Sequence, residues 1–183
     1  MANTSPGLAV PAERRAWFPL GVAIALVAAG VGLAVSQGAI RVLEAQLSAA
    51  LGSILGQHTQ AVGDSVIFPL GNRFVGWNLT LACTAALLVA PFFLLAAGLV
   101  ASGRLGIRRA LLTLGAVAVL VFAANQLRML VITISMREWG FVTGYERSHV
   151  LLGTVVSTLG LVIGLLVFIV SVSHHKPQPG RHA

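Results

Sequence analysis

The sequence predicts an all-α integral membrane protein with four transmembrane helices. Hydrophobic residues make up 57% of the 183-residue chain and charged residues only 9%, whereas soluble domains carry about 25% charged residues. Four stretches are long and apolar enough to cross a bilayer, which takes about 20 residues: 17–35, 79–101, 110–135 and 149–172. This composition excludes an ordinary soluble enzyme, a disordered chain and a nucleic-acid-binding protein.

The chain is predicted to form a single transmembrane domain over residues 17–172, since 183 residues leave no room for a second domain. Residues 1–16 form a cytoplasmic N-terminal segment, and the polar residues 173–183 form a disordered cytoplasmic tail. The first span follows Arg14 and Arg15. It is either a cleaved signal peptide or a retained anchor, and its long apolar run favours the anchor.

The distribution of charge predicts the orientation in the membrane. With both termini in the cytoplasm, the inner side holds seven Lys and Arg residues and one acidic residue, and the outer side holds four of each sign. The positive-inside rule selects this orientation, which places the protein in the cytoplasmic (inner) membrane. Trp17 falls at the inner boundary, Trp77 at the outer boundary and Trp139 in the outer loop, where an interfacial aromatic belt is expected.

The external segment between the first two spans has its own pattern. Apolar residues recur at steps of three and four over residues 40–55, which predicts an amphipathic helix on the outer leaflet. Residues 65–68 and 74–77 then flank a Pro-Leu-Gly-Asn sequence at 69–72. This pattern predicts a short, extended, hairpin-like loop that leads into the second span.

Three chemically distinctive residues are predicted to lie at one depth. Cys83, Arg128 and His149 belong to the second, third and fourth spans, and a rise of 1.5 Å per residue places them within about 10 Å of the external interface. Cys83 alone is typical of buried packing and His149 of an interfacial cap. Arg128 is more informative, because a guanidinium at mid-helix costs about 2.5 kcal/mol or more unless it reaches the interface. Asn125 shares its helix face.

A thiol, an imidazole and a guanidinium at one site suit thiol acyl transfer. The thiolate is the nucleophile, and the imidazole can take its proton or protonate a leaving amine. The guanidinium can bind a developing oxyanion. Small residues after His149 form a stripe that turns this side of the helix toward the bundle. One Cys and one His are too few for a zinc site, so no metal or cofactor is expected.

Three short motifs carry a resemblance to a known family. They are Ala82-Cys83-Thr84, Asn125-Gln126-Leu127-Arg128 and the His149–Gly153 segment, which reads His-Val-Leu-Leu-Gly. In order, spacing and depth they resemble the exosortase/archaeosortase family of membrane transpeptidases, over about residues 63–153. The chain would be a compact, four-helix core member, and it has Ala85 where the family often has glycine.

The resemblance implies a function and a set of site residues. Cys83 would be the nucleophile, Arg128 and His149 would complete the catalytic set, and Asn125 and Thr84 would support it. Family members act on membrane-anchored proteins with a C-terminal sorting signal made of a short motif, a hydrophobic helix and basic residues. They cleave this tail through a thioester and transfer the protein to an acceptor. Partners would thus be tailed proteins and the lipid bilayer, with no nucleic acid, and the oligomeric state is open.

The sequence leaves two other functions open. The chain could be a non-catalytic membrane subunit or small carrier in which Arg128 pairs with an anion or a partner helix. A haem-binding subunit requires axial ligands at facing depths, which His58 and His149 do not provide convincingly.

Overall fold

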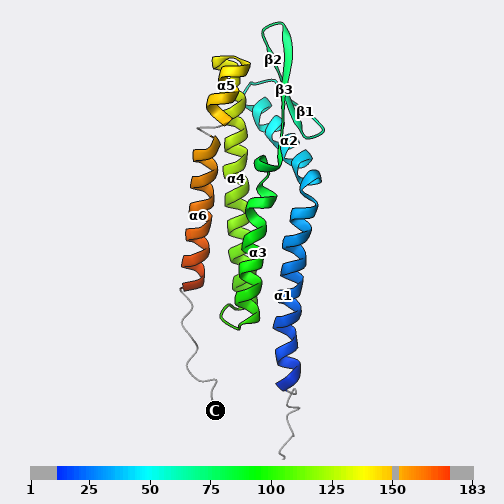
Figure 1. Cartoon of the computed structure of the whole chain (residues 1–183), viewed down its shortest axis with the longest axis vertical. Helices are drawn as coiled ribbons and strands as arrows, with labels where there is room; N and C mark the ends of the chain where they lie inside the picture. The colour runs from blue at the N-terminus through cyan, green and yellow to red at the C-terminus, as the bar shows by residue number, and fades with distance from the viewer. Residues whose placement is uncertain (1–11, 150–152, 174–183) are drawn as a thin grey trace, which may run out of the picture.

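The computed structural model is an elongated bundle of apolar helices with a small sheet and two shorter helices at one end (Figure 1). It describes residues 12–149 and 153–173. Residues 1–11 and 174–183, which hold most of the predicted terminal segments, lie outside the described residues. So do residues 150–152 of the predicted fourth span.

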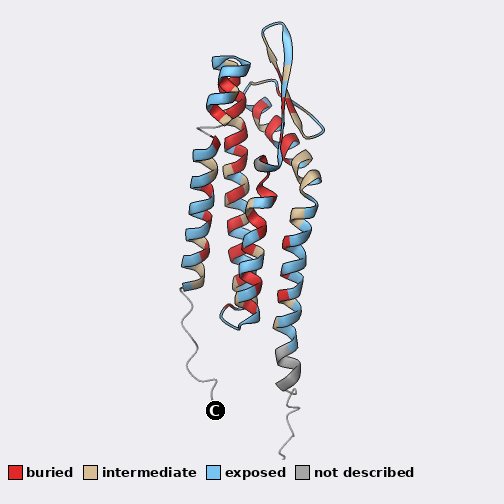
Figure 2. Ribbon diagram, viewed as in Figure 1, coloured by how far each residue is buried: buried red, intermediate tan, exposed pale blue. Residues whose placement is uncertain are grey.

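The bundle consists of α1 (Ala12–Val35), α3 (Ala85–Ala101), α4 (Ile107–Trp139) and α6 (Gly153–Ser173). Helix α1 packs on α3, α3 on α4, and α4 on α6. Figure 2 shows that α1 and α6 expose most of their residues, whereas α4 is more buried. Since the exposed side chains of α1 and α6 are largely apolar, their outer faces suit contact with lipid.

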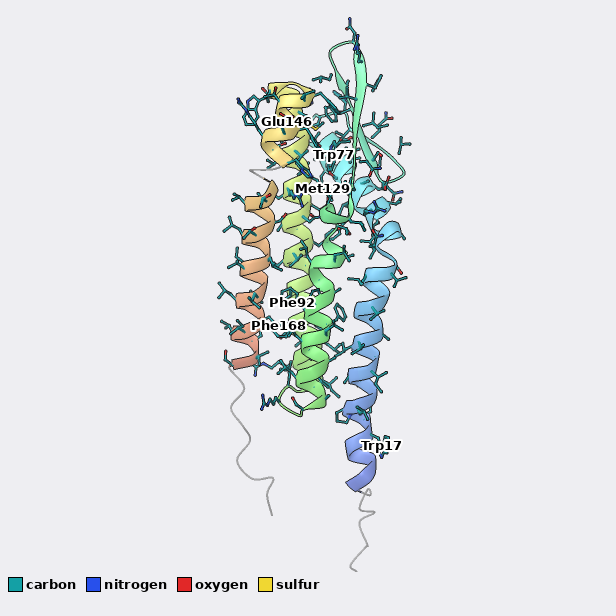
Figure 3. The ribbon with its side chains drawn as sticks, viewed as in Figure 1. Trp17, Trp77, Phe92, Met129, Glu146 and Phe168 are labelled. Atoms are coloured by element: carbon teal, nitrogen blue, oxygen red, sulfur yellow. The ribbon has the colours of Figure 1, made fainter. Side chains whose placement is uncertain are left out.

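An apolar core joins the helices along the bundle. Phe92 of α3 and Phe168 of α6 are buried in it (Figure 3), with ring centroids 5.7 Å apart. Glycines allow α6 to approach α4 closely: a Cβ at Gly160 would lie only 2.6 Å from Cβ of Ala124. The small-residue stripe of α6 therefore faces α4.

Three of the helices are long and apolar enough to cross a membrane: Trp17–Val35 within α1, α4 and α6. The second predicted span, 79–101, is helical only from Ala85, which leaves α3 with 17 apolar residues. Thr84 has an extended backbone and caps the helix with its hydroxyl, which accepts a hydrogen bond from the Ala86 amide. His149 lies before the first residue of α6.

Helix α2 (Gln37–Ile54) follows α1 after Ser36 and corresponds to the amphipathic segment at 40–55. It exposes its apolar side, including Leu43 and Leu47. The side that it buries carries small and polar residues: Glu44, Ala45, Ser48, Ala49 and Gly52.

A three-stranded antiparallel sheet follows α2, in the order β1 (Gln60–Val62), β2 (Ser65–Leu70) and β3 (Arg73–Asn78). The two predicted extended segments lie in β2 and β3, and β1 adds a strand that the sequence did not suggest. Gly71 turns the chain between β2 and β3 with a φ of 61°, which glycine adopts at little cost.

Trp77 of β3 does not belong to an interfacial belt. Its side chain is only 4% exposed and packs with Met129 of α4 (Figure 3). Its indole N–H donates a hydrogen bond to the Thr133 hydroxyl, 3.2 Å away. The prediction was wrong because the strand turns this ring inward, where α4 supplies the polar partner that a buried indole requires. Trp17 and Trp139 are exposed.

The two ends of the molecule hold different structural elements. The sheet, α2 and α5 (Phe141–Arg147) gather at one end (Figure 1). The start of α1, the turn between α3 and α4, and the end of α6 lie toward the other end. The two described termini therefore point to the same end, away from the sheet.

Candidate functional site

Cys83 lies in the segment that connects the sheet to α3. A short 3-10 turn, η1 (Leu81–Cys83), follows β3, and the Cys83 amide donates to the Thr80 carbonyl at 2.9 Å. The Thr80 hydroxyl donates to the sulfur of Cys83 at 3.4 Å. The cysteine side chain is only 2% exposed. Local hydrogen bonds thus fix both the backbone and the side chain of this residue.

The N-terminus of α3 begins directly after this turn. Thr84 accepts a hydrogen bond from the Ala86 amide at 3.2 Å, and the Ala85 amide donates to Oε1 of Glu44 at 2.8 Å. The first N–H groups of a helix have no acceptor within the helix. Here the side chains of Glu44 and Thr84 each accept a hydrogen bond from one of these groups. Cys83 therefore precedes a capped helix end that carries partial positive charge.

His149 meets Cys83 from the other side of the site. Its Nε2 lies 3.6 Å from Sγ of Cys83, which joins two residues 66 positions apart in the sequence. The imidazole stacks on the ring of Tyr145, with ring centroids 4.8 Å apart and an interplanar angle of 20°. Tyr145 belongs to α5, and the backbone widens into a π-type turn at Ser148 and His149. This stacking orients the imidazole toward the thiol.

The protonation state of these rings follows from their surroundings. Burial lowers the pKa of His149 below its ordinary value of 6.5, and the positive charge of Arg128 lowers it further. Burial raises the pKa of Tyr145, so the phenol keeps its proton. At neutral pH the imidazole is therefore uncharged and able to accept a proton from a thiol.

Arg128 is a buried cation next to this pair. It lies on α4 with 6% of its surface exposed, and its charge acts on both His149 and Tyr145. Gly153, the first residue of α6, packs directly against its side chain: a Cβ there would lie 2.9 Å from Nε of Arg128. The close approach of α6 thus confines the guanidinium to the region of the site.

Asn125 connects the nucleophile segment to α4. Its side-chain amide donates to the backbone carbonyl of Cys83 at 2.8 Å and to Oε1 of Glu44 at 3.3 Å. Asn125 and Arg128 are three residues apart and face the same side of α4. The predicted supporting residues Asn125 and Thr84 therefore both lie beside Cys83.

Two residues of the site were missed by sequence reasoning. Glu44 is fully buried on α2. Burial raises its pKa, which the hydrogen bond from the Ala85 amide opposes, followed by Thr84, Asn125 and the charge of Arg41. Its signal in the sequence was a lone acidic residue within the amphipathic pattern of 40–55. Tyr145 is the single tyrosine of the chain, and its signal was its place one helical turn before His149.

The structure brings together Cys83 and His149 in direct contact, with Asn125 and Thr84 alongside and Arg128 close to the imidazole. Among the described residues, no group of three or more His, Cys, Asp or Glu side chains could hold a metal ion. A buried thiol, an uncharged imidazole and a guanidinium together can carry out nucleophilic acyl transfer. Comparisons with protein-family models, curated proteins and solved structures find no match to this chain.

Proposed function

We propose that the chain is a membrane-embedded cysteine peptidase or transpeptidase that cleaves C-terminal sorting signals of exported proteins. The observation that carries the proposal is the 3.6 Å contact between Sγ of Cys83 and Nε2 of His149. A nucleophile within reach of a base, with the base oriented by a third group, is the usual arrangement for covalent catalysis. Here the orienting group is Tyr145, which stacks on the imidazole.

In the proposed reaction, His149 takes the thiol proton, and the sulfur of Cys83 attacks the carbonyl carbon of the scissile peptide bond. The guanidinium of Arg128 stabilises the negative charge that develops on the carbonyl oxygen. His149 then protonates the leaving amine as the C–N bond breaks, which leaves the substrate as a thioester on Cys83. An acceptor amine or water attacks the thioester, loses its proton to His149, and restores the thiol.

The membrane layout is part of this proposal. We place α1, α3, α4 and α6 across the cytoplasmic membrane, with both termini inside and the site near the external interface. Helix α3 is too short to cross the membrane by itself, and residues 79–84 supply the remaining length. Support comes from Arg104 in the turn between α3 and α4 and from Arg108 and Arg109 at the start of α4. This turn lies toward the end of the molecule away from the sheet (Figure 1). The positive-inside rule then assigns that end to the cytoplasm.

An apolar pocket near Cys83 supports the proposed substrate class. An apolar pocket of about 210 Å³ begins at Ala85 and Ala86, just after the cysteine, and extends between α1, α3 and α4. Side chains of a hydrophobic substrate helix fit such a pocket. Together with the motif resemblance to exosortases and archaeosortases, this supports a tailed membrane protein as substrate.

The deciding experiment traps the intermediate. The chain is co-expressed with a protein that ends in a hydrophobic helix and basic residues, and membranes are examined for an adduct on Cys83 that hydroxylamine releases. We expect this adduct with the wild-type chain and none with Cys83→Ala. The variant must still accumulate in the membrane, so that a missing adduct reports lost chemistry.

Normal removal of the tail by Cys83→Ala would overturn the proposal. It would favour the non-catalytic subunit or carrier, in which Arg128 pairs with an anion or a partner helix. The matched control is Ser102→Ala, because Ser102 is exposed at the far turn between α3 and α4. That variant should process the substrate like the wild type.

A further inference from the structure

We propose that Glu44 is a positioning residue of this site, which holds the backbone around Cys83 so that the thiol faces His149. This inference rests on the proposed function, because it assigns a role within the same Cys83–His149 pair. Glu44 belongs to α2, which contributes none of the residues predicted to be catalytic. The inference therefore makes α2 a part of the site.

Glu44 reaches the nucleophile segment by two routes. Its Oε1 accepts a hydrogen bond from the Ala85 amide at 2.8 Å, two residues beyond Cys83. The same oxygen accepts from Nδ2 of Asn125 at 3.3 Å, and that nitrogen also donates to the Cys83 carbonyl at 2.8 Å. One carboxylate oxygen thus fixes the start of α3 and the amide that binds the backbone of Cys83.

Arg41, one helical turn before Glu44, holds the other end of the segment. Its Nη1 donates to the Leu79 carbonyl at 2.7 Å, and its guanidinium pairs with Asp64 at 3.2 Å. The Leu79 amide donates in turn to the Asp64 carbonyl at 2.9 Å. Helix α2 therefore binds the nucleophile segment at both ends, at Leu79 and at Ala85.

The choice of buried face argues that this arrangement is more than packing. Leu43 and Leu47 of α2 are exposed, while Glu44 is fully buried and Ser48 nearly so. A buried carboxylate is costly unless hydrogen bonds compensate for lost hydration. Packing of this face is already served by small residues such as Ala45 and Ala49, and it does not require a buried acid. The acid instead supplies the acceptor for the Ala85 amide, a buried backbone group beside the turn that carries Cys83.

The contact with His149 is sensitive to this backbone. The sulfur of Cys83 and Nε2 of His149 are 3.6 Å apart, so a modest displacement of Cys83 would break their contact. Misplacing a reacting group by about 1 Å can cost about a hundredfold in rate. Tyr145 of α5 orients the imidazole by stacking on it, and α2 supplies the matching support on the sulfur side.

The test measures how strongly the reactivity of Cys83 depends on His149. Iodoacetamide alkylation of the full chain in native membranes reports on Cys83 alone, because it is the single cysteine. The rate is measured for the wild type, His149→Ala, Glu44→Ala and the double variant. We expect His149→Ala to slow alkylation about tenfold in the wild type and to have almost no effect when Glu44 is already alanine.

Two further variants separate positioning from general stability. Glu44→Gln keeps the accepting oxygen and should retain the dependence on His149 to within about threefold. Glu138→Ala removes an exposed acid of α4 and should leave the dependence of the alkylation rate on His149 unchanged. Full His149 dependence in Glu44→Ala, or its loss in Glu44→Gln, would overturn the inference.

The same measurement distinguishes failure of the proposed function. If His149→Ala does not slow alkylation even in the wild-type chain, the Cys83–His149 pair is not primed, and both proposals fall. If the wild type shows the dependence and Glu44→Ala retains it, only the role of Glu44 is lost.

Discussion

At the scale of single residues, the position of Arg128 matters most. A guanidinium within a membrane-spanning helix is costly, and Arg128 is nearly fully buried. Burial lowers the pKa of His149, and the charge of Arg128 lowers it further, which keeps the imidazole uncharged at neutral pH. This cation thus helps to keep the base ready to accept a proton.

The pH dependence of Cys83 reactivity should report this arrangement. Burial and the charge of Arg128 lower the pKa of His149 below 6.5. The imidazole therefore stays uncharged until the pH falls below this lowered pKa. In Arg128→Gln, the like charge is absent and the pKa of His149 should rise. The acid limb of the His149-dependent alkylation rate should therefore move to higher pH. An unchanged limb, or one at lower pH, would contradict the electrostatic role of Arg128.

Replacing Arg128 by lysine should impair tail cleavage severely, by about a hundredfold, although the charge is retained. A guanidinium presents several donors in a planar fork, whereas an ammonium is a point charge at a different place. The measurement is the rate of tail removal at equal protein level in the membrane. Arg147→Lys is the matched control, since Arg147 is exposed on α5. Equal activity of Arg128→Lys and the control would remove the oxyanion role.

At the scale of helices, the site depends on how closely α6 approaches α4. The glycines of α6 face α4, and Gly153 stands directly beside Arg128. Without a side chain at Gly153, the start of α6 closes over the guanidinium. The contact between these helices therefore serves both the packing of the bundle and the geometry of the site.

Gly153→Ala should displace Arg128 and lower tail cleavage by about tenfold or more. The new methyl group would lie 2.9 Å from Nε of Arg128 and 3.0 Å from the Ser148 carbonyl oxygen, which is too close for either. Gly115→Ala on α4 is the control, because nothing lies within 4 Å of a Cβ there, and it should be neutral or slightly stabilising. Equal cleavage rates in the two variants would show that α6 does not position the guanidinium.

At the scale of the whole molecule, the sequence predicted that Cys83 and His149 lie together, but it did not reveal Glu44, which supports them. Apolar length and alternating direction of the spans placed Cys83 and His149 at one depth, and the structure has them in contact. Hydropathy could not reveal Glu44, because it marks the apolar face of α2 as the important one. In a membrane that face suits lipid, and the polar face turns toward the protein.

Other differences arise from tertiary contacts that a one-dimensional pattern does not contain. The helix expected from residue 79 begins at Ala85, because Thr80 and Thr84 take extended backbone conformations on either side of a short 3-10 turn at Leu81–Cys83. The burial of Trp77 depends on Thr133, 56 residues away. Strand β1 is only three residues long. Its extended conformation depends on pairing with β2, which its own sequence does not indicate.

The orientation of the whole molecule yields the last prediction. In a Cys83→Ser background, single cysteines are introduced as Asn72→Cys at the tip of the sheet and Ser102→Cys at the turn between α3 and α4. Both positions are exposed and lie at opposite ends of the molecule (Figure 1). A membrane-impermeant thiol reagent applied to intact cells should label Asn72→Cys, and should label Ser102→Cys only after permeabilisation. The reverse pattern would place the site in the cytoplasm, where exported tails do not arrive, and equal labelling of both in intact cells would contradict a membrane-spanning bundle.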